Sequence, residues 1–275
     1  MTEQKSKIIE SAKFIGEKLD IKKYPSTAII TWKNPLFLKE FEIKKRIKYS
    51  DIPPVSGNAN SNEGDLLYAK LKGSTKYFLI LNGRFNFYDG YSMRDISHTV
   101  YVLKELGLKN LVLVEDVGSL NPQYSVGDIA LVSDHINLMG GNPLIGKNDE
   151  SLGPRFPDMS EAYNKDLYKN IEKSLIQQKF TFYSAVFLGI IGPQSETEAE
   201  CRFYRETGAD ILGYGIVPEN IAAVHCGLKC AAIGLVSREL VADRMEEITG
   251  EDYLKNRSSA EKNLGKVIRF ILNSI

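Results

Sequence analysis

Cysteine is scarce in this chain of 275 residues, and the three that occur form no framework. Cys201, Cys226 and Cys230 have neither metal-ligand spacing nor the even count of a disulfide scaffold. Cys226 and Cys230 lie in an apolar stretch, where cysteine usually acts as a small buried hydrophobe. The odd count is typical of a reducing compartment, so we expect a cytoplasmic protein without a metal site.

The chain also lacks an excess of charge of either sign and any long apolar run. Its 35 basic and 35 acidic residues cancel, so no global field draws it to nucleic acid or to an anionic membrane. No apolar run approaches the roughly 18 residues that a membrane-spanning helix needs, and the first residues have no apolar signal segment. We therefore expect neither a nucleic-acid partner nor a membrane partner.

What the chain does contain is a regular alternation of strand-like and helix-like segments. Short apolar runs predict strands at 27–32, 66–71, 76–81, 110–114, 127–133, 182–191, 211–215 and 230–236. Amphipathic spacing predicts helices at 6–18, 93–106, 167–178, 198–207, 218–226 and 260–275. Residues 50–64 and 140–159 are rich in turn-forming residues and predict loops. Because no linker or repeat interrupts this alternation, we expect one α/β domain over 1–275, with 1–25 forming an N-terminal helix and lead-in.

One strand-to-helix junction has the composition of a ligand site. The apolar run 185–191 breaks at Gly192-Pro193, and a polar segment of helical composition follows. Such strand ends gather ligands in open α/β sheets, because helix N-termini there offer unpaired N–H groups. Glu196 lies in this turn. Its carboxylate either recognises ring N–H groups of a ligand or caps the helix that begins near Thr197.

Several ordered blocks resemble the trimeric branch of the purine nucleoside phosphorylases, which includes the methylthioadenosine phosphorylases. The match runs from about Ala28 to the C-terminus. Its blocks are 82–91 (NGRFNFYDGY), 118–122 (GSLNP), 126–129 (VGDI), 134–138 (DHINL), 141–150 (GNPLIGKNDE), 155–163 (RFPDMSEAY), 192–202 (GPQSETEAECR) and 208–219 (GADILGYGIVPE). The resemblance implies a three-layer α/β sandwich with a central mixed sheet. It also implies a homotrimer in which a neighbouring subunit completes each site.

The reaction that this resemblance implies is phosphorolysis, in which phosphate attacks the anomeric carbon of a purine nucleoside and the purine departs. The transition state has oxocarbenium character, so the family holds an anion below the sugar and stabilises negative charge on the leaving base. The family uses no cofactor. Phosphate is a co-substrate of this chain only if the chain is active.

At the phosphate end, the resemblance maps onto mostly altered residues. The family's first serine, in a glycine-rich loop, corresponds to Lys33, and its first histidine to Asn86. A later serine corresponds to Gly215, and a histidine from a mobile loop aligns with Asn58. Only Arg84 is kept, and it either binds an anion or pairs with a neighbouring carboxylate.

Two acidic residues also fall near the expected phosphate. The family has small residues where this chain has Glu115 and Asp116. Because a desolvated carboxylate repels a second anion at close range, this change argues against phosphate in the usual pose. Asp89 is the neighbouring carboxylate that we expect to pair with Arg84 if Arg84 has a purely structural role.

At the base end, Glu196 matches the family glutamate that accepts purine N–H groups. The family asparagine that donates to the purine N7 is replaced by Arg238, which follows Ser237. The planar guanidinium of Arg238 either pairs with Glu196 in a bidentate contact, which fills the base pocket, or faces a different, anionic or carbonyl-bearing ligand. Ser195 replaces an aromatic neighbour, which thins one stacking wall.

At the sugar, Tyr88 matches a ribose-contacting tyrosine and Tyr214 replaces a methionine that packs on the ribose. Phe156 matches the aromatic that a neighbouring subunit inserts over the sugar, and Asp252 is the counterpart of a histidine near the 5′-hydroxyl. For the three aromatic residues, ordinary core or interface packing is the alternative.

The sequence therefore supports three hypotheses, none with an assigned catalytic residue. The first is a non-phosphorolytic protein that binds a small molecule, of nucleoside or purine-like type, in a remodelled pocket between subunits. The second is an active nucleoside phosphorylase with shifted specificity, in which Lys33 and Arg84 replace the lost neutral donors. The third is a structural role with an empty pocket. The predicted substrate-binding residues are Lys33, Arg84, Tyr88, Phe156, Glu196, Tyr214, Ser237 and Arg238.

Overall fold

The computed structural model describes residues 2–53, 64–245 and 249–275. Its strands are β1 (Thr27–Thr31), β2 (Phe41–Lys48), β3 (Asp65–Leu71), β4 (Tyr77–Asn82), β5 (Asn110–Ser119), β6 (Ile129–Asn137), β7 (Tyr183–Gly189), β8 (Ile211–Gly213) and β9 (Lys229–Glu239). Its α-helices are α1 (Glu3–Leu19), α2 (Met93–Glu105), α3 (Lys165–Gln177), α4 (Glu198–Glu206), α5 (Ile216–His225) and α6 (Gly250–Ser274). Short 3₁₀ turns are η1 (Leu36–Glu40), η2 (Tyr49–Asp51), η4 (Phe87–Asp89) and η5 (Ala242–Arg244).

The strands form one mixed sheet in the order β2-β3-β4-β1-β5-β8-β7-β6-β9. β2, β3 and β4 are antiparallel neighbours, whereas β1 runs parallel to both β4 and β5. The last strand, β9, pairs with β6 on one side and in parallel with β5 on the other. This second pairing closes β5, β8, β7, β6 and β9 into a ring, so strand ends that are far apart in sequence converge.

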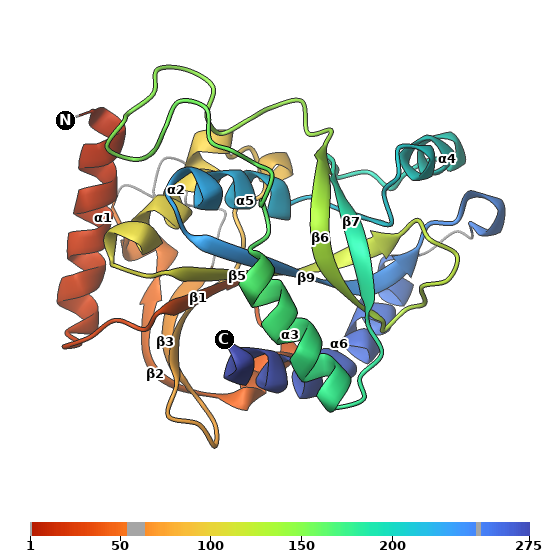
Figure 1. Ribbon diagram of the computed structural model, residues 1–275, viewed down its shortest axis with the longest axis horizontal. Coiled ribbons are helices and arrows are strands. Elements are labelled where there is room, and N and C mark those ends of the chain that lie inside the picture. The colour runs from red at the N-terminus through yellow and green to blue at the C-terminus, as the bar shows by residue number, and fades with distance from the viewer. Residues whose placement is uncertain (1, 54–63, 246–248) are drawn as a thin grey trace.

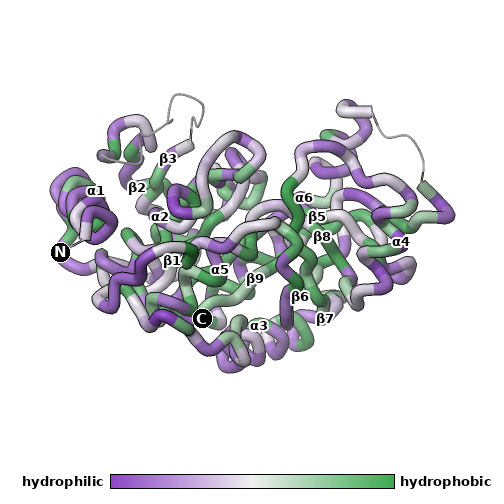
Figure 2. Tube along the Cα trace, turned by 90° about the horizontal axis from the view of Figure 1, so that it is seen from above, coloured by the Kyte–Doolittle hydropathy of each residue, from purple (hydrophilic) through white to green (hydrophobic). Residues whose placement is uncertain are grey.

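Helices cover both faces of the sheet, which confirms the predicted three-layer α/β sandwich. In Figure 1, α1, α2 and α5 lie on one side of the strands, and α3 and α6 lie on the other. The larger apolar cluster joins the first layer to the sheet through residues such as Ile8, Val100 and Ala222. The second joins α3 and α6 to the opposite face through Ile171 and Leu264. In Figure 2 much of the trace through the central strands is hydrophobic, whereas α1 and α3 contain many hydrophilic residues.

Several elements extend further than the sequence predicts. β5 continues through Glu115 and Asp116 to Ser119, and β9 continues through Ser237 and Arg238 to Glu239. These extensions carry charged residues that interrupt the apolar pattern on which the strand predictions depend. The extra length matters because β5 and β9 run in parallel, so it carries the altered charged residues of both strands to the same end of the pair.

The helix starts and one edge strand also differ from the expectations. α5 begins at Ile216, so Pro218 is its third residue and not its first, and α6 begins at Gly250, ten residues before the predicted start. The charged segment around 39–48 contains the edge strand β2, most of which is exposed. Asn58 and most of the predicted loop 50–64 lie outside the described residues.

No helix in the described ranges is long and apolar enough to cross a membrane. Among the same residues, no three histidine, cysteine or acidic side chains are grouped so that they could hold a metal ion.

Candidate functional site

The base end of the predicted pocket is a closed triad of side chains from three segments. Glu196 lies in the turn after β7, Tyr214 directly follows β8, and Arg238 is near the end of β9. Arg238 Nη1 lies 3.3 Å from Glu196 Oε2, and Arg238 Nη2 donates to the Tyr214 hydroxyl at 3.2 Å. That hydroxyl donates to Glu196 Oε1 at 2.9 Å. Both oxygens of Glu196 are therefore engaged within the chain.

The triad is largely withdrawn from solvent. The side chain of Glu196 is 2% exposed and that of Arg238 is 13% exposed. Burial raises the pKa of Tyr214 to about 12, so its hydroxyl keeps the proton that it donates to Glu196. The predicted approach of Arg238 to Glu196 is confirmed, but the guanidinium divides its two arms between Glu196 and Tyr214.

The other interpretation of Glu196, as a helix cap, is wrong. α4 is capped by Thr197, whose hydroxyl accepts from the Glu200 N–H at 3.3 Å while the Glu200 carboxylate accepts from the Thr197 N–H at 2.8 Å. This capping box satisfies the start of the helix. Glu196 is thereby left to point toward Arg238.

A β-bulge explains how Arg238 reaches the pocket. Val117 of β5 pairs with Val236, but the next residue of β5, Gly118, pairs with Arg238. Ser237 is thus an extra residue, and such an insertion re-aims the side chain that follows it. Ser237 itself is fully buried, and its hydroxyl donates to the Val117 carbonyl at 3.4 Å. Its side chain therefore links β9 to β5.

The phosphate end is built around Arg84, just beyond β4. Arg84 Nε and Nη2 donate to the two carboxylate oxygens of Glu219 at 2.9 and 3.1 Å, and Nη1 donates to the Val114 carbonyl at 3.2 Å. Burial lowers the pKa of Arg84, but the Glu219 and Glu115 carboxylates outweigh that effect and raise it. The predicted pairing of Arg84 with a carboxylate is thus confirmed, but the partner is Glu219 and not Asp89, which accepts from the Asn86 side chain at 3.0 Å.

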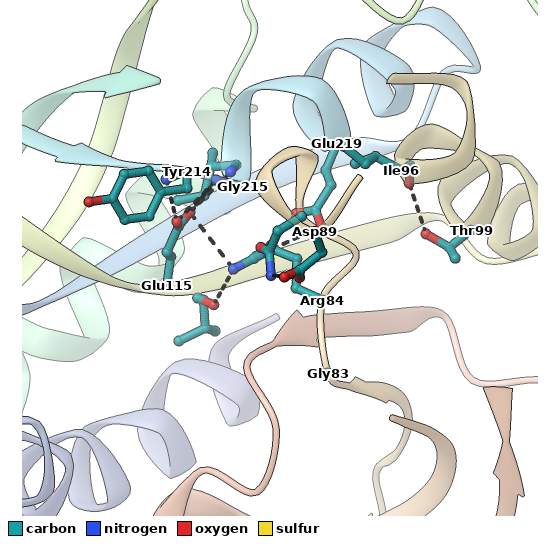
Figure 3. A network of polar contacts seen from close by, with 12 residues as sticks. Gly83, Arg84, Asp89, Ile96, Thr99, Glu115, Tyr214, Gly215 and Glu219 are labelled. Carbon is teal, nitrogen blue, oxygen red and sulfur yellow. Dashed lines mark hydrogen bonds and ion pairs between the residues drawn. The ribbon is translucent and has the colours of Figure 1, made fainter. Parts of the chain in front are cut away.

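A second carboxylate shares this end. Glu115 accepts hydrogen bonds from the backbone N–H groups of Tyr214 at 2.7 Å, Gly215 at 3.0 Å and Ile216 at 3.0 Å. Its Oε2 lies 3.7 Å from Arg84 Nη1, and its side chain is 7% exposed. Figure 3 shows the guanidinium of Arg84 between the Glu115 and Glu219 carboxylates. Burial raises the pKa of the Glu115 carboxyl, while Arg84 and the backbone N–H groups oppose that rise.

Asp116 points to the opposite side of β5 from Glu115 and meets α6. The Tyr253 hydroxyl donates to Asp116 Oδ2, and Arg257 lies with its guanidinium 5.0 Å from the centre of the Trp32 ring. Asp252, the predicted counterpart of a sugar-contacting histidine, instead accepts from the Thr249 N–H and hydroxyl at the start of α6. Glu219, Tyr253 and Arg257 were not predicted, because partners more than a hundred residues apart leave no local sequence signal.

Of the remaining predicted residues, Tyr88 packs against another residue of the site, whereas Lys33 and Phe156 are exposed. Tyr88 lies with the other pocket residues, its ring meeting the Tyr214 ring edge-on at 5.7 Å. Lys33 is exposed in the turn after β1, next to Asn34, whose φ of 54° is left-handed. Phe156 is 86% exposed and lines a separate hollow of about 500 Å³ with residues such as His135. The structure therefore gathers Arg84, Tyr88, Glu196, Tyr214 and Arg238, but places Phe156 elsewhere on the surface of the chain.

Chemically, the gathered residues form two ion-paired ends, and Tyr214 contacts both of them. At one end a guanidinium binds a carboxylate and a phenol, and at the other a guanidinium lies between two carboxylates. Figure 3 shows Tyr214 beside Glu115, so the same short segment after β8 contributes to both ends. Aromatic side chains and a few convergent polar groups are the combination that small-molecule sites use, and both kinds of side chain occur here.

The sandwich, with these side chains gathered at its strand ends, is similar to known proteins in sequence and in structure. Residues 30–273 match the family model of the phosphorylase superfamily. Purine nucleoside phosphorylase 1 of Bacillus subtilis is 37% identical over 256 residues, which cover 89% of this chain and 93% of that protein. Purine nucleoside phosphorylase of Mus musculus is 35% identical over 246 residues, covering 86% and 83% respectively.

Solved structures agree with these sequence matches. The crystal structure of Schistosoma mansoni purine nucleoside phosphorylase in complex with inosine has a TM-score of 0.87 to this chain, at 28% identity, covering 98% of this chain and 96% of that one. The adenosine complex of the same protein has a TM-score of 0.86. The chain is therefore a member of the phosphorylase superfamily. Within it, the chain belongs to the purine nucleoside phosphorylase family.

Proposed function

We propose that this chain binds a nucleoside-like or purine-like small molecule in the pocket between Arg84 and Glu196, and that ordinary purine phosphorolysis is lost or strongly reduced. The observation that carries the proposed loss of phosphorolysis is the Arg238–Glu196 ion pair at 3.3 Å, while the aromatic and polar side chains gathered around it support the binding of a small molecule. The carboxylate that relatives are expected to use for the purine is already neutralised by a residue of the same chain.

The ion pair opposes purine recognition on energetic grounds. A purine that binds Glu196 has to displace a charged donor and offer a neutral N–H group in its place. Hydrogen bonds to charged groups contribute about 1.5–3 kcal/mol each, and a buried charge left without its partner adds a penalty of its own. Arg238 would also lose Tyr214 if it moved away, because its other arm donates to that hydroxyl.

The phosphate end supports the same proposal. Of the groups with which the family is expected to hold phosphate, Arg84 is kept but is engaged by Glu219, and Gly215 has no hydroxyl to donate. The match to the family includes Glu219, so the Arg84–Glu219 pair alone does not argue against phosphate. Glu115 does, because it adds a buried carboxylate 3.7 Å from the arginine.

The size of the expected loss can be bounded. Removing one preorganised transition-state donor typically costs about 3 kcal/mol, or a hundredfold or more in rate. The phosphate end lacks several such donors and the base end lacks the asparagine. These losses are not additive, so we expect at least a hundredfold reduction in rate and not the product of all the terms.

An active phosphorylase with shifted specificity is the second candidate. The relatives with 35–37% identity over most of the chain are named as purine nucleoside phosphorylases, which favours retained catalysis. In that case Arg238 would act as a charged donor to the leaving base, and Lys33 with Arg84 would hold the phosphate. A structural role with an empty pocket remains the third.

We also propose that the chain forms a homotrimer and resides in the cytoplasm. The exposed Phe156 beside a hollow of about 500 Å³ supports assembly, since an aromatic side chain at 86% exposure is well placed to enter a neighbour's pocket. The three cysteines are buried and unpaired, which supports a reducing compartment.

The test of the proposed function is turnover. The purified protein is incubated with inosine, guanosine, adenosine or methylthioadenosine in phosphate buffer, and the released base is quantified beside a known phosphorylase of the family. We expect rates at least a hundredfold below that control with every nucleoside. Rates within tenfold of the control would refute the proposal in favour of the second candidate.

Mass spectrometry of the purified protein under non-denaturing conditions separates binding from a structural role. A bound small molecule supports the proposal. Its absence, together with no stabilisation by any nucleoside or purine in a thermal-shift series, would favour the empty scaffold.

A further inference from the structure

The Glu115 carboxylate occupies the start of α5 as a bound anion would. It accepts from three consecutive backbone N–H groups, those of Tyr214, Gly215 and Ile216, at 2.7–3.0 Å. The first residues of a helix carry unpaired N–H groups and partial positive charge, and together these bind oxyanions. Here the oxyanion is a side chain of the neighbouring strand β5, and it is sealed inside the protein.

Arg84 completes the surroundings of this carboxylate. Its Nη1 lies 3.7 Å from Glu115 Oε2 while its other nitrogens bind Glu219. Backbone N–H groups at a helix start and a nearby guanidinium are the donors that proteins combine to hold phosphate. Figure 3 shows these donors converging on Glu115.

Two glycines make room for this arrangement. A Cβ atom on Gly213 would lie 2.8 Å from Glu115 Oε1 and 3.0 Å from its carboxyl carbon. A Cβ atom on Gly215 would lie 2.3 Å from Arg84 Cδ. Gly215 is also the position at which the resemblance implies a phosphate-binding serine. The absence of a side chain at 215 therefore fits the observed position of Arg84, which a serine there would displace.

We propose that Glu115 is a specificity-determining residue, an internal carboxylate that occupies the donors at the start of α5 and thereby excludes orthophosphate from the pocket. This inference deepens the proposed function and rests on it for the identity of the pocket. A second anion at the same donors would contact a buried negative charge and would find the N–H groups already used. The pocket is consequently selective for ligands that carry no oxyanion at this end.

The experiment empties these donors and offers inorganic phosphate. Glu115→Ala removes the carboxylate, and Glu115→Gln removes only its charge while keeping an oxygen that can accept from the N–H groups. Glu198→Ala is the matched control, because Glu198 is the first residue of helix α4 and is exposed. The melting temperature and the calorimetric dissociation constant are measured with phosphate and with sodium chloride at equal ionic strength.

We expect no phosphate-specific stabilisation of the wild type or of Glu198→Ala. Glu115→Ala should bind phosphate at least tenfold more tightly than the wild type, with a melting temperature that rises with phosphate and not with chloride. Glu115→Gln should show a smaller gain in the same direction. Glu115→Gln keeps the acceptor, so it provides the test if the alanine variant does not fold.

Millimolar or tighter phosphate binding by the wild type would overturn the inference. So would two folded variants that bind phosphate no better than the wild type. The proposed function fails on a different observation, the turnover of a nucleoside by the wild type. A wild type without turnover whose Glu115 variants gain no phosphate binding would therefore overturn this inference alone.

Discussion

The two ends of the pocket differ in the sign of the charge that the resemblance assigns to a ligand and in the sign of its partner within the chain. At the base end, the resemblance assigns the carboxylate of Glu196 to the purine, and its partner in the structure is the guanidinium of Arg238. At the phosphate end, the resemblance assigns the guanidinium of Arg84 to the anion, and its neighbour in the structure is the carboxylate of Glu115. Each kept charge has met a new residue of opposite sign from its own chain. A side chain that the resemblance assigns to a ligand thus has its hydrogen-bonding capacity used within its own chain.

The ends differ in how firmly they are closed. Arg84 serves two buried carboxylates, and its side chain is 5% exposed. Arg238 serves one carboxylate and a phenol, and its side chain is 13% exposed. The phosphate end is therefore part of the folded core, whereas the base end is a contact that a ligand or a single substitution can open. The predictions below follow from that difference.

The largest expected effect is on stability, from removing each arginine in turn. Arg84→Met leaves Glu219 and Glu115 buried without a cation, so we expect a loss of about 3–5 kcal/mol in the free energy of unfolding. Arg238→Met should cost less, about 1–3 kcal/mol, because Glu196 keeps the hydrogen bond from Tyr214. Urea denaturation followed by circular dichroism measures both.

Arg202→Met is the control for Arg84→Met, because Arg202 also contacts two carboxylates but does so at the surface. Arg202 contacts Glu198 at 3.2 Å and Asp243 at 3.1 Å, but its side chain is 55% exposed. Exposed ion pairs contribute about 0–1 kcal/mol, so this variant should be near neutral. Equal losses from Arg84→Met and Arg202→Met would show that the phosphate end is not a buried ion-pair network.

A smaller effect is expected from adding one methyl group at Gly215. Its Cβ atom would lie 2.3 Å from Arg84 Cδ, so Gly215→Ala should displace the arginine and cost about 1–3 kcal/mol. Gly250→Ala is the control, because Gly250 is the first residue of α6 and a Cβ there meets nothing within 4 Å. That change should be neutral or slightly stabilising. A neutral Gly215→Ala would mean that Arg84 does not lie over Gly215.

The smallest effect concerns pH. Burial raises the pKa of Glu115 above its unfolded value. At pH values between the unfolded pKa and the folded pKa, the folded state therefore binds more protons than the unfolded state. Stability should then fall as pH rises from about 4.5 through the raised pKa, by at most about 1.4 kcal/mol per pH unit for this one group. Glu115→Gln removes the titration and should flatten the slope. Parallel profiles for the two proteins would contradict a raised pKa at Glu115.

The helices and strands of the fold were predictable because most elements carry their own periodicity, whereas their arrangement in three layers was predicted from the family resemblance. Apolar residues recur at helical spacing in α2 and α3 and form short runs in the strands from β3 to β9, because each element buries its apolar side chains within the sandwich. The ends of β5 and β9 were not predictable, because Glu115, Asp116 and Arg238 break the apolar pattern where the strands enter the pocket. β2 was missed for a similar reason, since an edge strand with two buried residues has almost no apolar signal.

Predictability was uneven within the site as well. The pairing of Arg238 with Glu196 was predictable once both positions were matched to the family. An arginine in place of an asparagine beside a carboxylate either pairs with that carboxylate or binds a different ligand. The position of Arg238 itself depends on the bulge at Ser237, which has no recognisable local signature. The contact of Glu115 with the start of α5 spans a hundred residues, and only the closure of β5 against β8 and β9 brings the two together.

Calorimetric titration of hypoxanthine onto the wild type and Arg238→Asn decides whether the Arg238–Glu196 ion pair lowers the affinity of the base end for a purine. The variant restores the residue that the resemblance implies and releases Glu196 from its ion pair. We expect the wild type to bind hypoxanthine weakly and the variant to bind it at least tenfold more tightly. Tight binding by the wild type, with no gain in the variant, would show that Arg238 and Glu196 do not block the purine.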